Sequence, residues 1–435
     1  MISKIRKLRE RTGLIKIFYN IGWQFFDKVI RMALSLIVGI WVARYLGPSN
    51  FGILNYGIAF IALFMPFSTA GLDTVLVREI IKNPSDTKYL LGASFYLKII
   101  FGITSYILSI TISYLLNPDN YLENLTVAIL GIGLITQAFD TIEYYLQSKL
   151  NVKLSVIAKT SAFILVAGLR VVFILNESPL IYFICAGAIE LLIATLFLVI
   201  INRGPYNIST WKWSSIHGSK LLKDSWPLIL SSFAIMIYMR IDQIMINQML
   251  GNSSVGIYSA AVRVSEVFYF IPMTISNSIF PKLVQLKNAS KELFAKRLSQ
   301  FFILMTWVSI CIALSVTVFA DNIIAILYGP NFSESAKILS IQTWAGIFVF
   351  LGVAGGQYLM IENLTKYAFY QTVTGAVVNV GLNLILIPAY GIIGSSIATV
   401  IAYSCSAVFS NAFFSKTRIV FFMQLNSFNF LKYLK

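Results

Sequence analysis

Long apolar segments recur along the whole chain and set the first limit on its fold. A helix needs roughly 20 mostly apolar residues to cross a bilayer, and about twelve segments of this sequence meet that requirement. They are residues 17–46, 50–72, 89–116, 124–147, 155–176, 179–201, 221–250, 254–280, 298–320, 336–361, 367–388 and 390–414. The sequence therefore predicts an all-α polytopic membrane protein with about twelve transmembrane helices.

The balance of apolar and charged residues agrees with this class. Of the 435 residues, 57% are hydrophobic and 12% are charged, whereas soluble domains carry about 25% charged residues. The net charge of +16 comes mostly from lysines and arginines in the termini and in every second predicted connection, and the alternate connections hold none. This distribution follows the positive-inside rule. It places both termini in the cytoplasm and argues against a nucleic-acid partner.

A weak internal repeat divides the predicted helices into two sets of six. A shift of 204 residues aligns Leu46-Gly47 with Leu250-Gly251, and Gly52-Ile53 with Gly256-Ile257. Parallel repeats of this kind are common in transporters, where the substrate site lies between the repeats. The predicted organisation is an N-terminal lobe (1–202), a cytoplasmic linker (203–220) with Trp211 and Trp213 as interfacial anchors, a C-terminal lobe (221–414) and an interfacial tail (415–435).

The sequence lacks the motifs that mark several classes of enzyme and metal site. No zinc-protease, nucleophile-elbow or phosphate-loop motif occurs, and no segment is long enough for a sizeable soluble domain. The three cysteines lie in predicted spans and His217 is the single histidine, so neither a disulfide framework nor a metal site is expected. We expect a protein that is not an enzyme and holds no cofactor, with a proton or sodium gradient as the candidate energy source.

Charged side chains inside the predicted spans are the strongest functional candidates. Such groups are costly in a bilayer and usually pair with one another or line a water-filled cavity. Arginine suits an anionic headgroup because its planar guanidinium binds two phosphate oxygens at once. The candidates for binding a pyrophosphate or a sugar are Arg31, Lys28, Lys98, Arg170, Arg240, Arg263, Asn379 and Asn383. The candidates for ion coupling are Asp27, Asp242, Glu266, Asp140 and Glu143.

A purely structural interpretation competes with that one. The spacing of Asp27 with Arg31, and of Arg263 with Glu266, puts each pair on one face of a helix, where it can form a buried ion pair. The asparagines of the eleventh span can join helices by hydrogen bonds instead of contacting sugar hydroxyls. The sequence leaves both interpretations open.

The segment around the first predicted turn resembles a known family. The run ARYLGPSNFGILNYG (43–57), preceded by Asn20, Trp23 and Arg31, is similar to the opening of the polysaccharide transporter family. These proteins are the Wzx-type O-antigen and capsule flippases of the multidrug/oligosaccharidyl-lipid/polysaccharide exporter superfamily. The pattern LGNSSVGIYSAA (250–261) extends the resemblance into the second half. The resemblance implies a MATE-like fold of two six-helix lobes with alternating access.

The resemblance also implies a function. The expected substrate is an oligosaccharide repeat unit on undecaprenyl pyrophosphate, moved from the cytoplasmic to the periplasmic leaflet of the bacterial inner membrane, with coupling to a proton or sodium gradient. The expected partners are this lipid-linked oligosaccharide and the bilayer, with a polysaccharide polymerase and chain-length machinery as candidate protein partners. Arg31 and the charges of the seventh and eighth spans become expected cavity residues. The alternative is a MATE-type cation-coupled multidrug exporter, which shares the fold but lacks the 43–57 signature.

Overall fold

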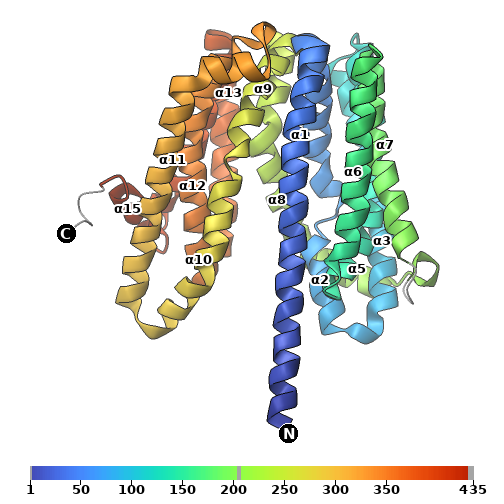
Figure 1. Cartoon of the computed structure of the whole chain (residues 1–435), viewed down its shortest axis with the longest axis vertical. Helices are drawn as coiled ribbons and strands as arrows, with labels where there is room; N and C mark the ends of the chain where they lie inside the picture. The colour runs from blue at the N-terminus through green and yellow to red at the C-terminus, as the bar shows by residue number, and fades with distance from the viewer. Residues whose placement is uncertain (1, 203–206, 430–435) are drawn as a thin grey trace. The chain divides into compact units, whose positions relative to one another are not determined.

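The computed structural model describes residues 2–202 and 207–429, with side chains described from Trp23 onward except Gln24. The described residues form helices and contain no β-strand, so the predicted all-α class is confirmed (Figure 1). The side chains of the predicted interfacial segment 1–16 lie outside this set. Positions 203–206 of the predicted linker and 430–435 of the predicted tail also lie outside the described residues.

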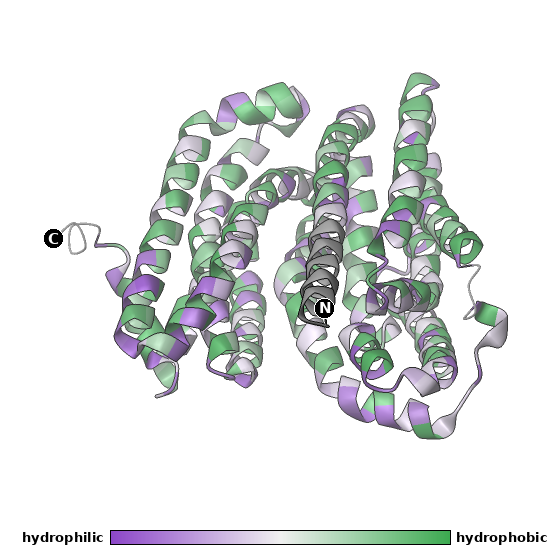
Figure 2. Cartoon of the chain, turned by 60° about the horizontal axis from the view of Figure 1, so that its bottom comes forward, coloured by the Kyte–Doolittle hydropathy of each residue, from purple (hydrophilic) through white to green (hydrophobic). Residues whose placement is uncertain are grey.

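Ten helical stretches among the described residues are long and apolar enough to cross a membrane. Two of these, Phe25–Lys82 and Thr365–Phe413, contain a glycine with non-helical dihedral angles, Gly47 and Gly391. The sequence predicts turns at both glycines and therefore counts two spans in each stretch, which accounts for the difference between ten and twelve. Hydrophobic residues occur along all the long helices (Figure 2), and many large apolar side chains are exposed, as expected for helices that contact lipid.

Contacts group the chain into two compact units, and each is described by itself. The first unit comprises Met1–Tyr45 and Gly57–Phe233, and the second comprises Leu46–Tyr56 and Ala234–Lys435. Two helices are divided between the units, namely α1 (Ile2–Ser68) and α8 (Ser215–Leu250). The lobe boundaries expected from the sequence stay a prediction.

The other elements fall within one unit each. The first unit contains α2 (Asp73–Lys82), η1 (Pro84–Asp86), α3 (Thr87–Leu116), α4 (Tyr121–Thr136), η2 (Gln137–Asp140), α5 (Thr141–Ser148), α6 (Val152–Leu175), α7 (Leu180–Ile201) and η3 (Ile208–Thr210). The second unit contains α9 (Asn252–Val267), α10 (Phe270–Ala289), α11 (Lys291–Leu327), η4 (Pro330–Phe332), α12 (Ser335–Ile361), α13 (Thr365–Ser404), the π-helical η5 (Cys405–Phe409), α14 (Ser410–Phe413) and α15 (Arg418–Asn426).

Helix α1 consists of two helical segments that meet at Gly47. Contacts in the first segment place residues 27–45 alongside residues 160–178 of α6, running in the same direction. Contacts in the second segment place residues 57–68 alongside residues 126–134 of α4, again in the same direction. A tight turn at residues 149–151 separates α5, which continues the course of α4, from α6. Because α4 and α6 therefore run in opposite directions, the chain turns back at Gly47.

The turns at the start of the two repeats share one backbone conformation. Gly47 has φ 70° and ψ 173°, and Gly251 has φ 82° and ψ 178°. A positive φ with an extended ψ is open essentially to glycine alone. The common geometry therefore explains why both turns carry glycine, and it confirms the correspondence that the 204-residue shift predicts.

Two predicted connections are shorter in the structure than the sequence suggests. Helix α11 continues to Leu327, so the predicted connection 321–335 is wrong over its first half. The chain leaves the helix only at Gly329, which has a φ of 82° and is followed by Pro330. Helix α8 likewise begins at Ser215, inside the predicted linker. A drop in hydropathy does not end a helix, whereas a glycine at positive φ such as Gly329 does.

The start of α8 is tied to α2 of the first unit by charge pairs. Lys220 Nζ lies 2.7 Å from Glu79 Oε2, and Arg78 pairs with Asp224. Trp211 precedes this helix and is buried with its ring centroid 5.3 Å from that of Phe95. The prediction of Trp211 as an interfacial anchor is therefore wrong, because its indole fills the core of the first unit.

The tail folds back on the second unit as α15. Gln424 is fully buried, and its Nε2 donates to the carbonyl oxygens of Ala407 (2.9 Å) and Leu351 (3.3 Å). Its Oε1 accepts a hydrogen bond from Asn411 at 3.2 Å. Ala407 belongs to the π-helical turn, where the irregular backbone leaves room for side-chain partners. The amide of Gln424 thus joins α15 to α12 and to the end of the last long helix.

Replacing Gln424 with alanine should destabilise the second unit, because three buried polar groups each lose one hydrogen bond. Each lost hydrogen bond costs about 0.5–1.5 kcal/mol. We expect a lower denaturation midpoint for the purified protein in detergent. Gln285→Ala, at an exposed position on α10, is the control and should leave the midpoint unchanged. An equal effect of both substitutions would contradict the role of Gln424.

Candidate functional site

One cluster of the first unit joins α1, α6 and α7. Arg31 Nε lies 2.6 Å from Asp27 Oδ1, and Asp27 also accepts a hydrogen bond from Thr160. The guanidinium carbon of Arg31 lies 5.3 Å from the ring centroid of Phe163. The Nη2 atom of Arg31 is buried and has no hydrogen-bond partner among the described residues. The Asp27–Arg31 pair predicted from the spacing is thus present, and it leaves one guanidinium nitrogen open.

A second pair continues this cluster along α6. Arg170 Nη2 lies 3.0 Å from Glu190 Oε2 of α7, with both side chains about one-fifth exposed. The sequence shows Arg170 and Glu190 in consecutive predicted spans but does not specify their pairing. The pair neutralises the charge of Arg170, so this guanidinium is not a free anion-binding group in the described arrangement.

The two acidic candidates of the fourth predicted span, Asp140 and Glu143, form ion pairs with a lysine. Lys159 Nζ lies 2.7 Å from Asp140 Oδ1 and also pairs with Glu143. The sequence interpretation assigns Lys159 to a cytoplasmic connection and does not predict it as their partner. The η2 turn (Gln137–Asp140) alters the helical phase there, so that Gln137 accepts a hydrogen bond from Ser68 while the two carboxylates face α6.

Lys98 is completely buried beside the second helix of the first unit. Its Nζ lies 3.2 Å from Asp73 Oδ1 and 4.4 Å from the ring centroid of Tyr144. A lysine that snorkels to the interface would expose its ammonium group, which this one does not. Its partners instead satisfy a buried charge by an ion pair and a cation–π contact.

A deeply buried carboxylate belongs to the second unit. Asp242 is 4% exposed and accepts hydrogen bonds from Tyr258 (2.7 Å), Thr399 (2.7 Å) and Asn383 (3.2 Å). Asn383 also donates to Oδ1 of Asn379 at 3.0 Å. The other amide atom of Asn383, Oδ1, is buried without a hydrogen-bond partner. Helices α8, α9 and α13 thus bring a carboxylate, two hydroxyls and two amides to one point.

This cluster combines a carboxylate with several neutral oxygen atoms. Carboxylate, amide and hydroxyl oxygens are the ligands that hard cations prefer, and a carboxylate is equally able to take up a proton. No basic side chain is among the hydrogen-bond partners of Asp242 in the part of the chain that the structure describes. Of the predicted ion-coupling residues, Asp242 therefore has the surroundings best suited to a cation or a proton. Its role stays a prediction.

The remaining candidates of the second unit pair differently from the sequence expectation. Glu266 Oε2 lies 3.5 Å from Arg240 Nη2, whereas Arg263 Nη2 donates to Asn55 Oδ1 at 3.5 Å. Glu266 thus has Arg240 as a partner that the sequence does not predict, and Arg263 contacts the segment that follows the first turn. The Arg263–Glu266 pair stays a prediction. Lys28, a candidate of the first unit, has an exposed side chain.

Several residues of these clusters carry no signal in the sequence. Thr160, Tyr258 and Thr399 are hydroxyl residues within apolar segments, where a threonine usually bonds the backbone of its own helix. Thr399 in fact makes that local bond as well, to the Ser395 carbonyl oxygen at 3.0 Å. Only the packing of distant helices shows that all three also contact a carboxylate.

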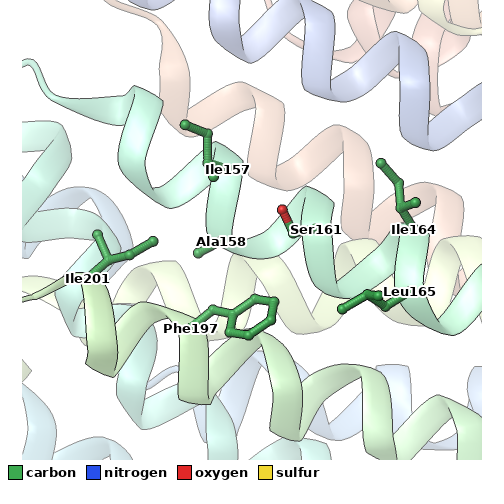
Figure 3. A pocket seen from close by; sticks show the side chains of 7 residues that line it. All are labelled: Ile157, Ala158, Ser161, Ile164, Leu165, Phe197 and Ile201. Carbon is green, nitrogen blue, oxygen red and sulfur yellow. The ribbon is translucent and has the colours of Figure 1, made fainter.

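A shallow pocket lies on the first unit between α6 and α7 (Figure 3). It encloses about 390 Å³ and is lined by Ile157, Ala158, Ser161, Ile164, Leu165, Phe197 and Ile201. No charged side chain lines it, so it is separate in character from the clusters described above. Such a lining suits a hydrocarbon chain and offers little to an ion or a sugar.

Solved structures of other membrane proteins share this arrangement of helices. A solved structure described as an inward-facing multidrug resistance MATE family transporter superposes with a TM-score of 0.72 at 14% identity, covering 93% of this chain and 96% of that one. Lipid II flippase MurJ superposes with a TM-score of 0.72 at 17% identity, covering 95% and 92%. At such low identity these likenesses show the fold alone, which is the predicted MATE-like fold.

Sequence comparison identifies the family. The model of the family described as polysaccharide biosynthesis protein matches residues 17–287, and the MatE model matches residues 227–385. The chain belongs to the polysaccharide biosynthesis protein family, which confirms the resemblance seen in residues 43–57.

Curated relatives match over most of their length. The "Probable low-salt glycan biosynthesis flippase Agl15" of Haloferax volcanii is 25% identical over 396 residues, covering 88% of this chain and 80% of the relative. The "Putative O-antigen transporter" of Shigella flexneri is 23% identical over 411 residues, covering 88% and 94%. The "Capsular polysaccharide biosynthesis protein CapF" of Staphylococcus aureus is 20% identical, covering 88% and 95%.

The Arg170–Glu190 pair permits a test between the structural and the ligand-binding interpretation. Arg170→Met alone leaves a buried carboxylate unpaired, at a cost on the order of 3 kcal/mol, so we expect less folded protein in membranes. Adding Glu190→Met should restore the amount of folded protein, measured by size-exclusion chromatography in detergent. If the restored double variant also transports normally, Arg170 does not bind substrate. If it folds but does not transport, the structural interpretation fails.

Proposed function

We propose that this multi-pass membrane protein is a flippase for lipid-linked oligosaccharide repeat units, of the type used for O-antigen or capsule. The observation that carries this proposal is the near full-length similarity to relatives named as a glycan biosynthesis flippase and an O-antigen transporter. The substrate carries a pyrophosphate and many hydroxyls, while its polyprenyl chain is apolar. The proposed carrier is undecaprenyl pyrophosphate, and the proposed location is the bacterial cytoplasmic membrane.

The structure supports transport by supplying buried polar groups on membrane helices. A charged headgroup crosses the hydrocarbon core only if protein groups replace its water. The unpartnered Nη2 of Arg31 is a donor available to a phosphate or sugar oxygen. We therefore keep Arg31 as the leading substrate-binding candidate of the first unit. The other arginine pairs would have to open before they could bind an anion.

The proposed mechanism is alternating access of two repeat-related halves. The lipid chain remains in the bilayer while the headgroup passes through the protein. No covalent bond changes in this process, so we propose transport and not catalysis. A polysaccharide polymerase and chain-length machinery are the proposed protein partners, because they would consume the translocated repeat unit.

Deleting the gene in its host should separate this proposal from the multidrug alternative. We expect loss of the surface glycan and accumulation of lipid-linked repeat units that an external glycosidase cannot reach in intact cells. Sensitivity to cationic drugs should not change. An intact surface glycan together with increased drug sensitivity would favour a cation-coupled multidrug exporter. The MatE match over 227–385 and the shared fold are the observations that support this alternative.

We further propose that Asp242 binds the coupling proton or sodium ion. The support is its enclosure by Tyr258, Thr399 and Asn383, with the unpartnered Oδ1 of Asn383 nearby. Asn379 completes this group as a second amide. A carboxylate that takes up and releases a cation during each cycle would link transport to the gradient.

Asp242→Asn removes the titratable group and keeps nearly the same shape. We expect purified protein in liposomes to lose the stimulation of transport by an imposed pH or sodium gradient, while gradient-independent exchange persists. Asp321→Asn, at an exposed position on α11, is the control and should keep the full stimulation. Unchanged gradient dependence in Asp242→Asn would remove Asp242 as the coupling site.

A further inference from the structure

One exposed stripe of α3, in the first unit, changes from apolar to aromatic toward the start of the helix. Its apolar part consists of three exposed isoleucines at helical spacing, Ile100, Ile103 and Ile107. Tyr96 and Tyr89 continue the same face of the helix and are also exposed, and the exposed Lys88 comes directly before them. In a membrane helix, this order marks the passage from hydrocarbon to lipid headgroups. It places the two tyrosines at headgroup level and Lys88 on the aqueous side.

The segment that precedes α8 adds a second lysine at this level. The backbone N–H of Lys212 donates to the Lys88 carbonyl oxygen at 3.2 Å. A Cβ atom placed on Gly92 would lie 2.2 Å from the Lys212 carbonyl oxygen, so this approach requires glycine. The segment therefore lies directly against the first turns of α3, within the first unit. The side chains of Lys88 and Lys212 start from adjoining backbone, and both are exposed.

The next residue, Trp213, extends along α3 toward the apolar side. Its ring centroid lies 6.1 Å from that of Tyr96, with the rings edge to face. Tyr96 lies about two helical turns past Lys88. The Trp213 side chain is 48% exposed, so part of the indole is open to lipid. Tryptophan and tyrosine favour this depth because their rings are apolar and carry one polar atom.

The two lysines keep their charge unpaired. The carboxylates of neighbouring elements have partners of their own, namely Glu79 with Lys220, Asp224 with Arg78 and Asp86 with His217. Lys88 and Lys212 form no ion pair with any residue that the structure describes. We call Lys88, Tyr89, Tyr96, Lys212 and Trp213 the lysine–aromatic patch. It combines two free cations with an exposed aromatic surface on the side of the hydrocarbon.

We propose that the lysine–aromatic patch binds an anionic phospholipid of the leaflet that it faces, which the distribution of basic residues predicts to be the cytoplasmic one. Lys88 and Lys212 contact the phosphate, and Trp213 with Tyr96 contacts the glycerol and the first acyl carbons. Lysine ammonium groups donate hydrogen bonds to phosphate oxygens. A phospholipid without net charge is bound less well, because its headgroup cation repels the lysines. The proposal requires a chain that spans a bilayer and does not rest on the flippase function.

Quenching of Trp213 fluorescence by brominated lipids tests this proposal. The full chain is placed in nanodiscs of phosphatidylglycerol and phosphatidylcholine in equal amounts, with bromine on the acyl chains of one lipid at a time. Bromine quenches an indole only at short range. The part of the quenching that disappears in Trp213→Phe belongs to Trp213, which separates its signal from that of the other tryptophans.

We expect brominated phosphatidylglycerol to quench Trp213 more than brominated phosphatidylcholine does. Each lysine near an anionic lipid surface should contribute roughly a fivefold preference. The double substitution Lys88→Gln with Lys212→Gln should therefore make the two lipids quench nearly equally. Lys88→Arg with Lys212→Arg keeps both charges and should keep the preference.

A matched pair of lysines in the second unit controls for net charge. Lys291 and Lys296 are exposed on α11, and Lys291→Gln with Lys296→Gln removes the same charge without touching the patch. This variant should keep the preference of Trp213 for phosphatidylglycerol. Equal quenching by both lipids in the unsubstituted protein would overturn the proposal. So would a preference that survives the Lys88 and Lys212 glutamines, or one that the control pair abolishes equally. None of these measurements involves transport, so the lipid site and the flippase function can fail independently.

Discussion

The cost of charge in a bilayer is the constraint on which the rest of this structure depends. An ionised side chain away from water must find a partner, and most of the charged residues on these helices have one nearby. Arg31 pairs with Asp27, Arg170 with Glu190, and Arg240 with Glu266. The helices are thus joined by ion pairs as well as by apolar packing. The polar atoms of these clusters that have no hydrogen-bond partner are the candidates for binding a ligand.

Two such atoms connect the architecture to the proposed function. The open nitrogen of Arg31 can meet an anionic headgroup, and the open oxygen of Asn383 lies in the shell of a carboxylate that carries no basic partner among its hydrogen bonds. One unit therefore offers a donor for substrate and the other an acceptor for a cation. A transporter that couples the two needs both kinds of group.

Much of the fold was predictable because it follows from local properties of the chain. Apolar length, the distribution of basic residues and the repeated glycine turn each depend on a short stretch of sequence. The candidate site was predictable only in part. The i, i+4 spacing of Asp27 and Arg31 places them on one helix face, so their pairing follows from α-helical geometry. The partners of Glu266, Asp140 and Asp242 lie on other helices, and no local pattern specifies which helices pack together.

The sequence by itself determined the membrane class, the family through residues 43–57, and the need for glycine at the two turns, because these depend on hydropathy and backbone conformation. Only the tertiary structure decided what the charged residues contact. Arg263 contacts Asn55, in the segment that follows the first turn. Asp242 accepts hydrogen bonds from hydroxyls of two other helices, and the side chains of Trp211 and Gln424 are buried. The physical reason is that a side chain's partner in a membrane protein is set by helix packing across long sequence separations.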